Sequence, residues 1–185
     1  MEAIVSFSPD IADAPWRPER ELVIANALCE VTGLRAHFVL RRLGASHVLQ
    51  LALFEDANAL EQASRVVVQA LGRLPRVHVP GHFREICHVL EWDEATGMEP
   101  KYVRVHAFRV SQPGRNQSFP SSAQRETGAR FAGTGLLQGP EHRFCVALWA
   151  SHIAAGRAPV QMVAPRPNGS YEVETYVRPP TVVEV

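Results

Sequence analysis

Ten residues carry the strongest structural signal in this sequence: Leu51-Ala-Leu-Phe-Glu-Asp-Ala-Asn-Ala-Leu60. A short apolar run ends in the aromatic Phe54, and the acidic Asp56 then opens an alanine-rich segment. Apolar runs of this length are typical of buried strands, and an aspartate at such a junction is typical of a helix N-cap. The stretch therefore predicts a strand that passes directly into a helix.

A fainter copy of this pattern occurs later, as Val146-Ala-Leu-Trp-Ala-Ser-His-Ile-Ala-Ala155. Phe54 and Trp149 lie 95 residues apart, which is about half of the 185-residue chain. A repeat of that length is too long for a solenoid and suggests a duplicated small domain. We expect two related units, residues 1–95 and 100–185, separated by a segment with Gly97 and Pro100.

The first half predicts the order strand, helix, strand, strand, helix, strand. The helices are expected from Pro18 to Gly33 and from Asp56 to Gly72, because proline suits a first helical turn and glycine a helix end. The strands are expected at residues 3–7, 34–43, 46–54 and 84–92, with Gly44-Ala45 as a hairpin turn. This order is that of a split βαβ, or ferredoxin-like, unit.

The second half predicts the same order in a damaged form. Strands are expected at residues 102–110, 143–149 and 170–178, and helices at 122–131 and 152–156. The glycine-rich run Gly133-Thr-Gly-Leu-Leu-Gln-Gly-Pro140 takes the place of much of the first hairpin. Because a ferredoxin-like sheet has helices on one face only, its other face needs cover. We therefore predict an α+β fold in which two antiparallel sheets pack face to face as an α+β barrel.

The stretches at 51–60, at Gly33-Leu-Arg-Ala-His-Phe-Val-Leu-Arg-Arg42 and at Val146-Ala-Leu-Trp-Ala-Ser151 resemble the antibiotic-biosynthesis-monooxygenase group of the dimeric α+β barrel superfamily. The resemblance implies two ferredoxin-like units packed sheet to sheet, which one chain can carry. Its members include cofactor-independent oxygenases of electron-rich aromatic molecules and haem-degrading enzymes. In the haem-degrading members a strand-borne Asn, a Trp and a His form the site. Trp149 alone falls at a matching position here.

Composition excludes several classes of function. The 19 basic and 19 acidic side chains cancel, so the chain lacks the positive charge that nucleic-acid binding needs. The N-terminus has no signal-peptide pattern, and no apolar run approaches the roughly 18 residues of a membrane span. Cys29, Cys87 and Cys145 are distant from one another, which favours free buried thiols and a cytoplasmic location. We expect no nucleic-acid or membrane partner, and either a monomer with an internal pseudo-dimer or a homodimer.

Candidate site residues come from strand faces that mix aromatic, cationic and aliphatic side chains. Such faces are typical of an apolar pocket with a few polar anchors, and equally of half-exposed strands. Because histidine titrates near neutral pH, His88 and His106 are the predicted catalytic bases. The predicted substrate-binding residues are His37, Trp92, Tyr102, Arg104 and Trp149. His78 and His82 would need a third ligand to hold a metal, so we predict neither metal nor cofactor.

Three functions remain open from the sequence. The first is a small cofactor-independent oxygenase that holds an aromatic or polyketide-like molecule between the two sheets. The second is a ligand-binding or stress-response module with the same pocket and no chemistry. The third is a fold kept for assembly, with a sheet face as the subunit interface.

Overall fold

The fold is a closed antiparallel barrel with two helices on one side, as a computed structural model shows for residues 1–9, 11–94, 98–110, 131–150 and 169–177. The strands follow one another around the barrel in the order β1-β3-β2-β8-β5-β7-β6-β4, and β4 pairs again with β1. The predicted α+β class and barrel are therefore confirmed. The helices predicted at 122–131 and 152–156 lie outside the described residues, except for Phe131, which begins strand β6.

The first half forms the elements that its pattern predicts. They are β1 (Glu2–Ser8), α1 (Arg17–Cys29), β2 (Leu34–Arg42), β3 (Val48–Phe54), α2 (Ala57–Leu71) and β4 (Phe83–Glu94). Pro18 lies in the first turn of α1, where its missing N–H costs no hydrogen bond. The Asp56 carboxylate accepts a hydrogen bond from the Ala59 backbone N–H at 2.8 Å and caps α2.

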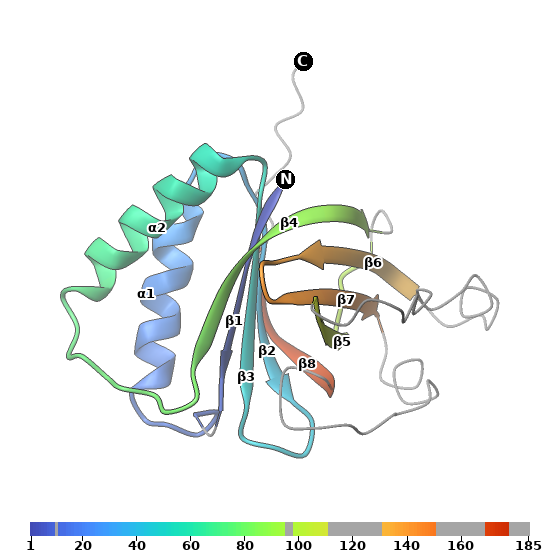
Figure 1. The fold of residues 1–185 in the computed structure, drawn as a ribbon. Helices are drawn as coiled ribbons and strands as arrows, with labels where there is room; N and C mark the ends of the chain where they lie inside the picture. Colours follow the sequence, from blue (N-terminus) through green and yellow to red (C-terminus); the bar gives the residue numbers. More distant parts are fainter. Residues whose placement is uncertain (10, 95–97, 111–130, 151–168, 178–185) are drawn as a thin grey trace.

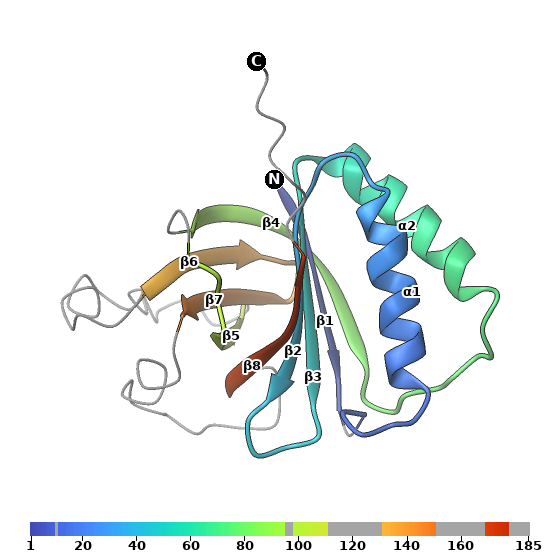
Figure 2. The same ribbon diagram turned by 180° about the vertical axis from the view of Figure 1, so that it is seen from behind.

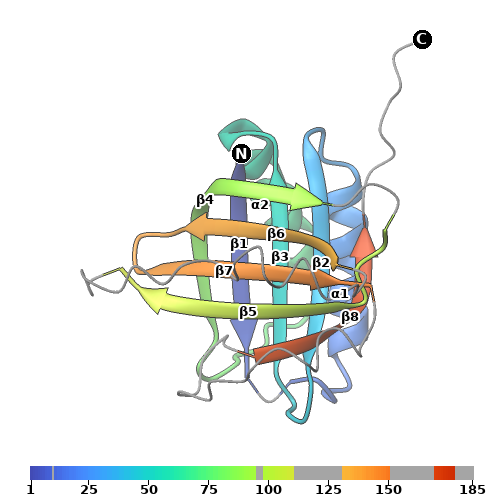
Figure 3. The ribbon, with the colours of Figure 1, turned by 90° about the vertical axis from the view of Figure 1, so that its right-hand side faces the viewer.

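The second half supplies β5 (Tyr102–Arg109), β6 (Phe131–Gln138), β7 (His142–Trp149) and β8 (Gly169–Val177). Figure 1 shows α1 and α2 on one side of the first four strands and β5–β8 on the other. Viewed from the side of the second half, β5, β6 and β7 cross in front of β1, β2 and β3 (Figure 3). From behind, β8 lies beside β2, with which it pairs (Figure 2).

The interior of the barrel is a packed apolar core shared by all eight strands. Large side chains from both halves meet there with almost no exposure, among them Phe38, Leu51, Leu137, Phe144 and Tyr171. Alternation along β2 agrees with the sequence: Ala36, Phe38 and Leu40 belong to this core, and His37 and Val39 do not. The space between the sheets, where the sequence pattern places a ligand pocket, is thus occupied by core side chains.

The glycine-rich run at 133–140 is mostly a strand, β6, and the expectation of a damaged element there is wrong. A Cβ at Gly135 would overlap the ring of Trp92, which packs into the barrel core from β4. Gly133 has φ 149° beside a register shift between Phe131 and Gly133, a conformation that L side chains rarely adopt. These glycines are a packing requirement of the strand and not a sign of a loop.

We expect Gly135→Ala to lower the free energy of unfolding by about 1–3 kcal/mol, since the new methyl group must displace the Trp92 ring. In the double variant with Trp92→Leu, the cost should fall at least ~1 kcal/mol short of the sum of the single costs. Gly72→Ala is the control, because Gly72 has φ −61° and ends a helix. Urea unfolding of the wild type, the two single variants, the double variant and the control measures this, and strictly additive costs would contradict the proposed overlap.

Candidate functional site

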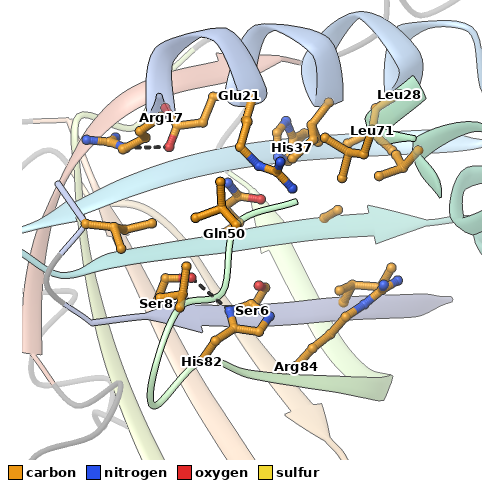
Figure 4. Close-up of a pocket in the computed structure, with 18 of the residues that line it drawn as sticks. Ser6, Ser8, Arg17, Glu21, Leu28, His37, Gln50, Leu71, His82 and Arg84 are labelled. Carbon is orange, nitrogen blue, oxygen red and sulfur yellow. Dashed lines mark hydrogen bonds and ion pairs between the residues drawn. The ribbon is translucent and has the colours of Figure 1, made fainter. Parts of the chain in front are cut away.

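A pocket of about 460 Å³ lies between the two helices and the outer face of strands β1, β2 and β3, with Arg84 of β4 also in its lining. Its walls come from α1, α2, β1, β2 and β3, and from the connector that leads from α2 into β4. Figure 4 shows α1 above the pocket, with His37, Gln50 and Ser6 on successive strands below it. Much of the wall is apolar; it includes Ile24, Leu28, Phe54, Val67 and Leu71. A cleft with apolar walls and a few polar groups suits a small organic ligand.

His37 is the most unusual group in this pocket. Its side chain is 2% exposed, and its Nδ1 has no hydrogen-bond partner among the residues that the structure describes. Burial lowers the pKa of the imidazole to about 4, so the ring is neutral at pH 7. A buried polar atom without a partner costs free energy, and such atoms are rare in folded proteins. His37 lines the pocket, but its Nδ1 is itself enclosed, so a ligand that displaces the ring enough to hydrogen-bond to Nδ1 would remove this cost.

The pocket also contains a charged network at the start of α1. The Arg17 guanidinium is buried; its Nε donates to Glu21 at 2.5 Å, and another nitrogen donates to Glu174 of β8. A third donor of Arg17 reaches the Ala12 carbonyl at 2.6 Å. On the other side of the pocket, the hydroxyl of Ser8 on β1 lies 2.8 Å from the His82 Nδ1 (Figure 4). Arg17 therefore ties the pocket wall to a strand of the second half.

The lowered pKa of His37 makes stability depend on pH. The unfolded imidazole titrates near 6.5 and the folded one near 4, so between these values the unfolded state binds more protons. Stability contributed by the neutral ring is therefore complete above pH 6.5 and is lost as the pH falls towards 4. We expect a loss of about 3 kcal/mol from this residue. Urea unfolding at pH 7 and pH 4 should show a smaller loss in His37→Gln, and equal losses would contradict the assignment.

Four of the predicted site residues lie together on the outer face of the neighbouring strands β5 and β7. Tyr102 on β5 is the direct partner of Trp149 on β7, and the Arg104 guanidinium lies 5.9 Å from the Trp149 ring centroid. His106 follows on the same face of β5 and stacks on Phe108. Burial and the neighbouring Arg104 lower the pKa of His106. The structure thus brings Tyr102, Arg104, His106 and Trp149 together, at a distance from the pocket that contains His37.

His88 and Trp92 lie neither in the pocket with His37 nor in the group around Trp149. The His88 side chain is 76% exposed on β4, where its Nδ1 lies 2.8 Å from a carboxylate oxygen of Glu2. The alternation of β4 predicts that Trp92 shares the face of His88. A register shift between Val89 and Glu91 reverses that alternation, so Trp92 points into the barrel and contacts Phe38, with ring centroids 6.2 Å apart.

Sequence reasoning missed most of the pocket. Ser6, Gln50, Arg20 and Arg84 line it together with His37, yet they belong to four different elements and form no motif. The outward positions of β1, β2 and β3 could have been aligned through the predicted pairing of the strands. That alignment would have placed His37 and Gln50 on the face that the helices cover.

The described residues contain no cluster of three or more His, Cys, Asp or Glu side chains that could hold a metal ion. No helix in the described ranges is long and apolar enough to cross a membrane. The three cysteines are free; Cys87 is buried as expected, whereas Cys29 is exposed.

Comparison with solved structures identifies proteins of the same fold. An anthrone oxidase-like protein matches with a TM-score of 0.58 and 13% identity, over 96% of this chain and 92% of that one. A proposed monooxygenase from Fusobacterium nucleatum matches with a TM-score of 0.63 and 8% identity, over 96% and 94%. Another, from Lactobacillus acidophilus, matches with a TM-score of 0.59 and 10% identity, over 96% and 97%. No protein-family model and no curated protein matches the sequence.

Proposed function

We propose that the protein binds a small aromatic molecule in the pocket beneath α1 and α2 and oxidises it with molecular oxygen, without a bound metal or organic cofactor. The buried, unpartnered Nδ1 of His37 in a largely apolar pocket is the observation that carries this proposal. The fold shared with an anthrone oxidase-like protein and with proposed monooxygenases supports it. Oxygen enters apolar spaces readily, and burial excludes the water that would compete for reactive intermediates.

In this proposal His37 accepts a proton from an activated CH₂ group or a hydroxyl of the substrate. The resulting anion gives electrons to O₂, a C–O bond forms, and a CH₂ group becomes C=O while the second oxygen atom leaves as water. The pKa of His37 is low because burial in the protein desolvates the charged ring. A substrate anion formed beside the imidazolium would offset that desolvation and raise the pKa at the moment of transfer.

The two halves of the chain support the further proposal of an internal duplication. In the first half Phe54 pairs with Glu2 on β1 and Leu34 on β2, and in the second half Trp149 pairs with Tyr102 on β5 and Phe131 on β6. Register shifts follow Leu34 and Phe131 at the same place in each sheet. We propose that the chain is a cytoplasmic monomer whose ferredoxin-like halves form an internal pseudo-dimer. By this equivalence His106 corresponds to Ser6 of the pocket, and it remains our second candidate base.

A ligand-binding module without chemistry is the second candidate function. It is favoured by the pKa of about 4, because a group so weakly basic has little driving force to remove a proton. In that case the His37 Nδ1 would only donate to or accept from a polar group of the ligand.

Anthrone and simple polyphenols, in chelator-treated buffer, test both functions. Saturable quenching of Trp fluorescence measures binding, and an oxygen electrode measures turnover. Binding with oxygen uptake that is lost at least ~100-fold in His37→Gln supports the oxygenase. Binding without uptake supports the module, and absence of binding contradicts both. His88→Gln is the matched control, since that ring is exposed. Uptake that is lost in His88→Gln or His106→Gln and kept in His37→Gln would move the base away from the pocket.

A further inference from the structure

The pocket contains more positive than negative charge. Among the described residues that line it, Arg17, Arg20 and Arg84 are cationic and Glu21 is the one carboxylate. Arg17 is neutralised by Glu21 and Glu174. Neither Arg20 nor Arg84 lies within ion-pair distance of a carboxylate among the residues that the structure describes. Two positive charges of the pocket are therefore left without a counter-charge.

The two arginines keep donors available. Arg20 on α1 uses one nitrogen to donate to the Pro75 carbonyl at 3.0 Å and lies over the Trp16 ring. Arg84 on β4 makes one long hydrogen bond, 3.4 Å, to the Ser64 hydroxyl on α2. Figure 4 shows Arg84 on the opposite side of the pocket from α1. Each guanidinium has five N–H donors in a planar fork that fits a carboxylate or phenolate oxygen, so most of them remain free for a ligand.

Partial desolvation lowers the pKa of Arg84, so the charged guanidinium has a desolvation cost. An anion beside it would offset that cost. Burial lowers the pKa of His37 to about 4, so that ring is neutral at pH 7. Partial desolvation and the positive charge of Arg84 lower the pKa of His82.

We propose that the natural ligand of this pocket is an anion: an aromatic molecule with an ionised acidic group that lies between Arg20 on α1 and Arg84 on β4. Its apolar body would lie against the wall that includes Leu28, Phe54 and Leu71. The inference rests on the proposed function, since it assigns a substrate class to the same pocket. It also gives the substrate an orientation, with the acidic group at the arginines and the remaining ring system directed towards His37.

Two dyes with the same ring skeleton test the charge preference. Anilinonaphthalene sulfonate has one sulfonate, and phenylnaphthylamine is the same molecule without it; both fluoresce in apolar sites. We expect the anionic dye to bind at least about tenfold more tightly than the neutral dye. Arg20→Gln and Arg84→Gln should each weaken the binding of the anionic dye by about tenfold and have little effect on the binding of the neutral dye. Arg65→Gln is the matched control, because Arg65 is 73% exposed on α2 and does not line the pocket.

Equal affinity for the two dyes, unchanged in the Arg20 and Arg84 variants, would overturn the anion assignment and leave the pocket as a binding site. Failure of both dyes to bind would overturn the anion assignment and the proposed function together. Ser6→Phe, which fills the pocket from β1, locates the signal: the anionic dye should lose its affinity in this variant. Binding that persists there would place the dye elsewhere and contradict the proposal. Thermal unfolding of each variant confirms that the fold is retained.

Discussion

Glu85→Ala is expected to lower the free energy of unfolding by about 3–5 kcal/mol, the largest effect of a single polar substitution in this barrel. The Glu85 carboxylate is 7% exposed at the end of the barrel. Its Oε1 accepts hydrogen bonds from the backbone N–H groups of Glu141 and His142 at 2.8 and 2.9 Å, and its Oε2 lies 2.8 Å from the His142 Nδ1. Alanine leaves all three of these partners without an acceptor.

Urea unfolding followed by far-UV circular dichroism measures this effect. Glu85→Gln keeps an oxygen for the two backbone donors and should cost about 1–3 kcal/mol. Glu61→Ala is the control, since Glu61 is 67% exposed on α2 and should change stability by less than ~0.5 kcal/mol. A cost below ~1 kcal/mol for Glu85→Ala would mean that strand pairing alone holds this end of the barrel.

The Glu85 carboxylate also explains why residue 139 is a glycine. A Cβ at Gly139 would overlap Glu85, so the turn between β6 and β7 requires glycine in order to close over the buried acid. Glycine is depleted in strands, and the sequence pattern predicts no strand across Gly133, Gly135 and Gly139. The Trp92 ring and the Glu85 carboxylate come from β4, which precedes β6 by some 40 residues in the chain. Local pattern contains no information about such partners, and for this reason the strand was missed.

Elements with local signals were predictable. Asp56 caps α2 through its own side chain, and Pro18 fits the first turn of α1, so both helix starts depend on neighbouring residues alone. The alternation of β2 correctly separates Phe38 from His37, because the bulge in that strand lies at its start, between Leu34 and Ala36, and leaves the alternation of residues 36–40 intact. In β4 the register shift after Val89 reverses the alternation of inward and outward side chains. Trp92, which the sequence pattern places on a pocket wall, therefore lies in the core.

The location of the candidate site depends more on tertiary packing than the helix starts and the strand alternation do. The sequence predicts His37 as a binding residue, and the structure places it in a pocket. It does not predict that the pocket lies under the helices, because the outer face of a sheet and its inner face have the same period of two. Which face is filled depends on side-chain volumes from both halves, and here Phe38, Phe144 and Tyr171 fill the interior. The ligand space is left on the helix-covered face.

Phe54→Ala and Trp149→Ala are each expected to cost about 3–5 kcal/mol, because both side chains are large, buried and at equivalent register positions. Phe54 is fully buried among Leu28, Leu34 and Ala59 beneath the helices. Trp149 is 5% exposed and lies beside Arg104. Leu22→Ala is the control, since Leu22 is 62% exposed on α1. Equal costs, with the slope of the unfolding free energy against urea concentration unchanged, would support two equivalent cores. A cost below ~1 kcal/mol for Trp149→Ala would contradict the duplication and indicate that this ring is the wall of a binding surface.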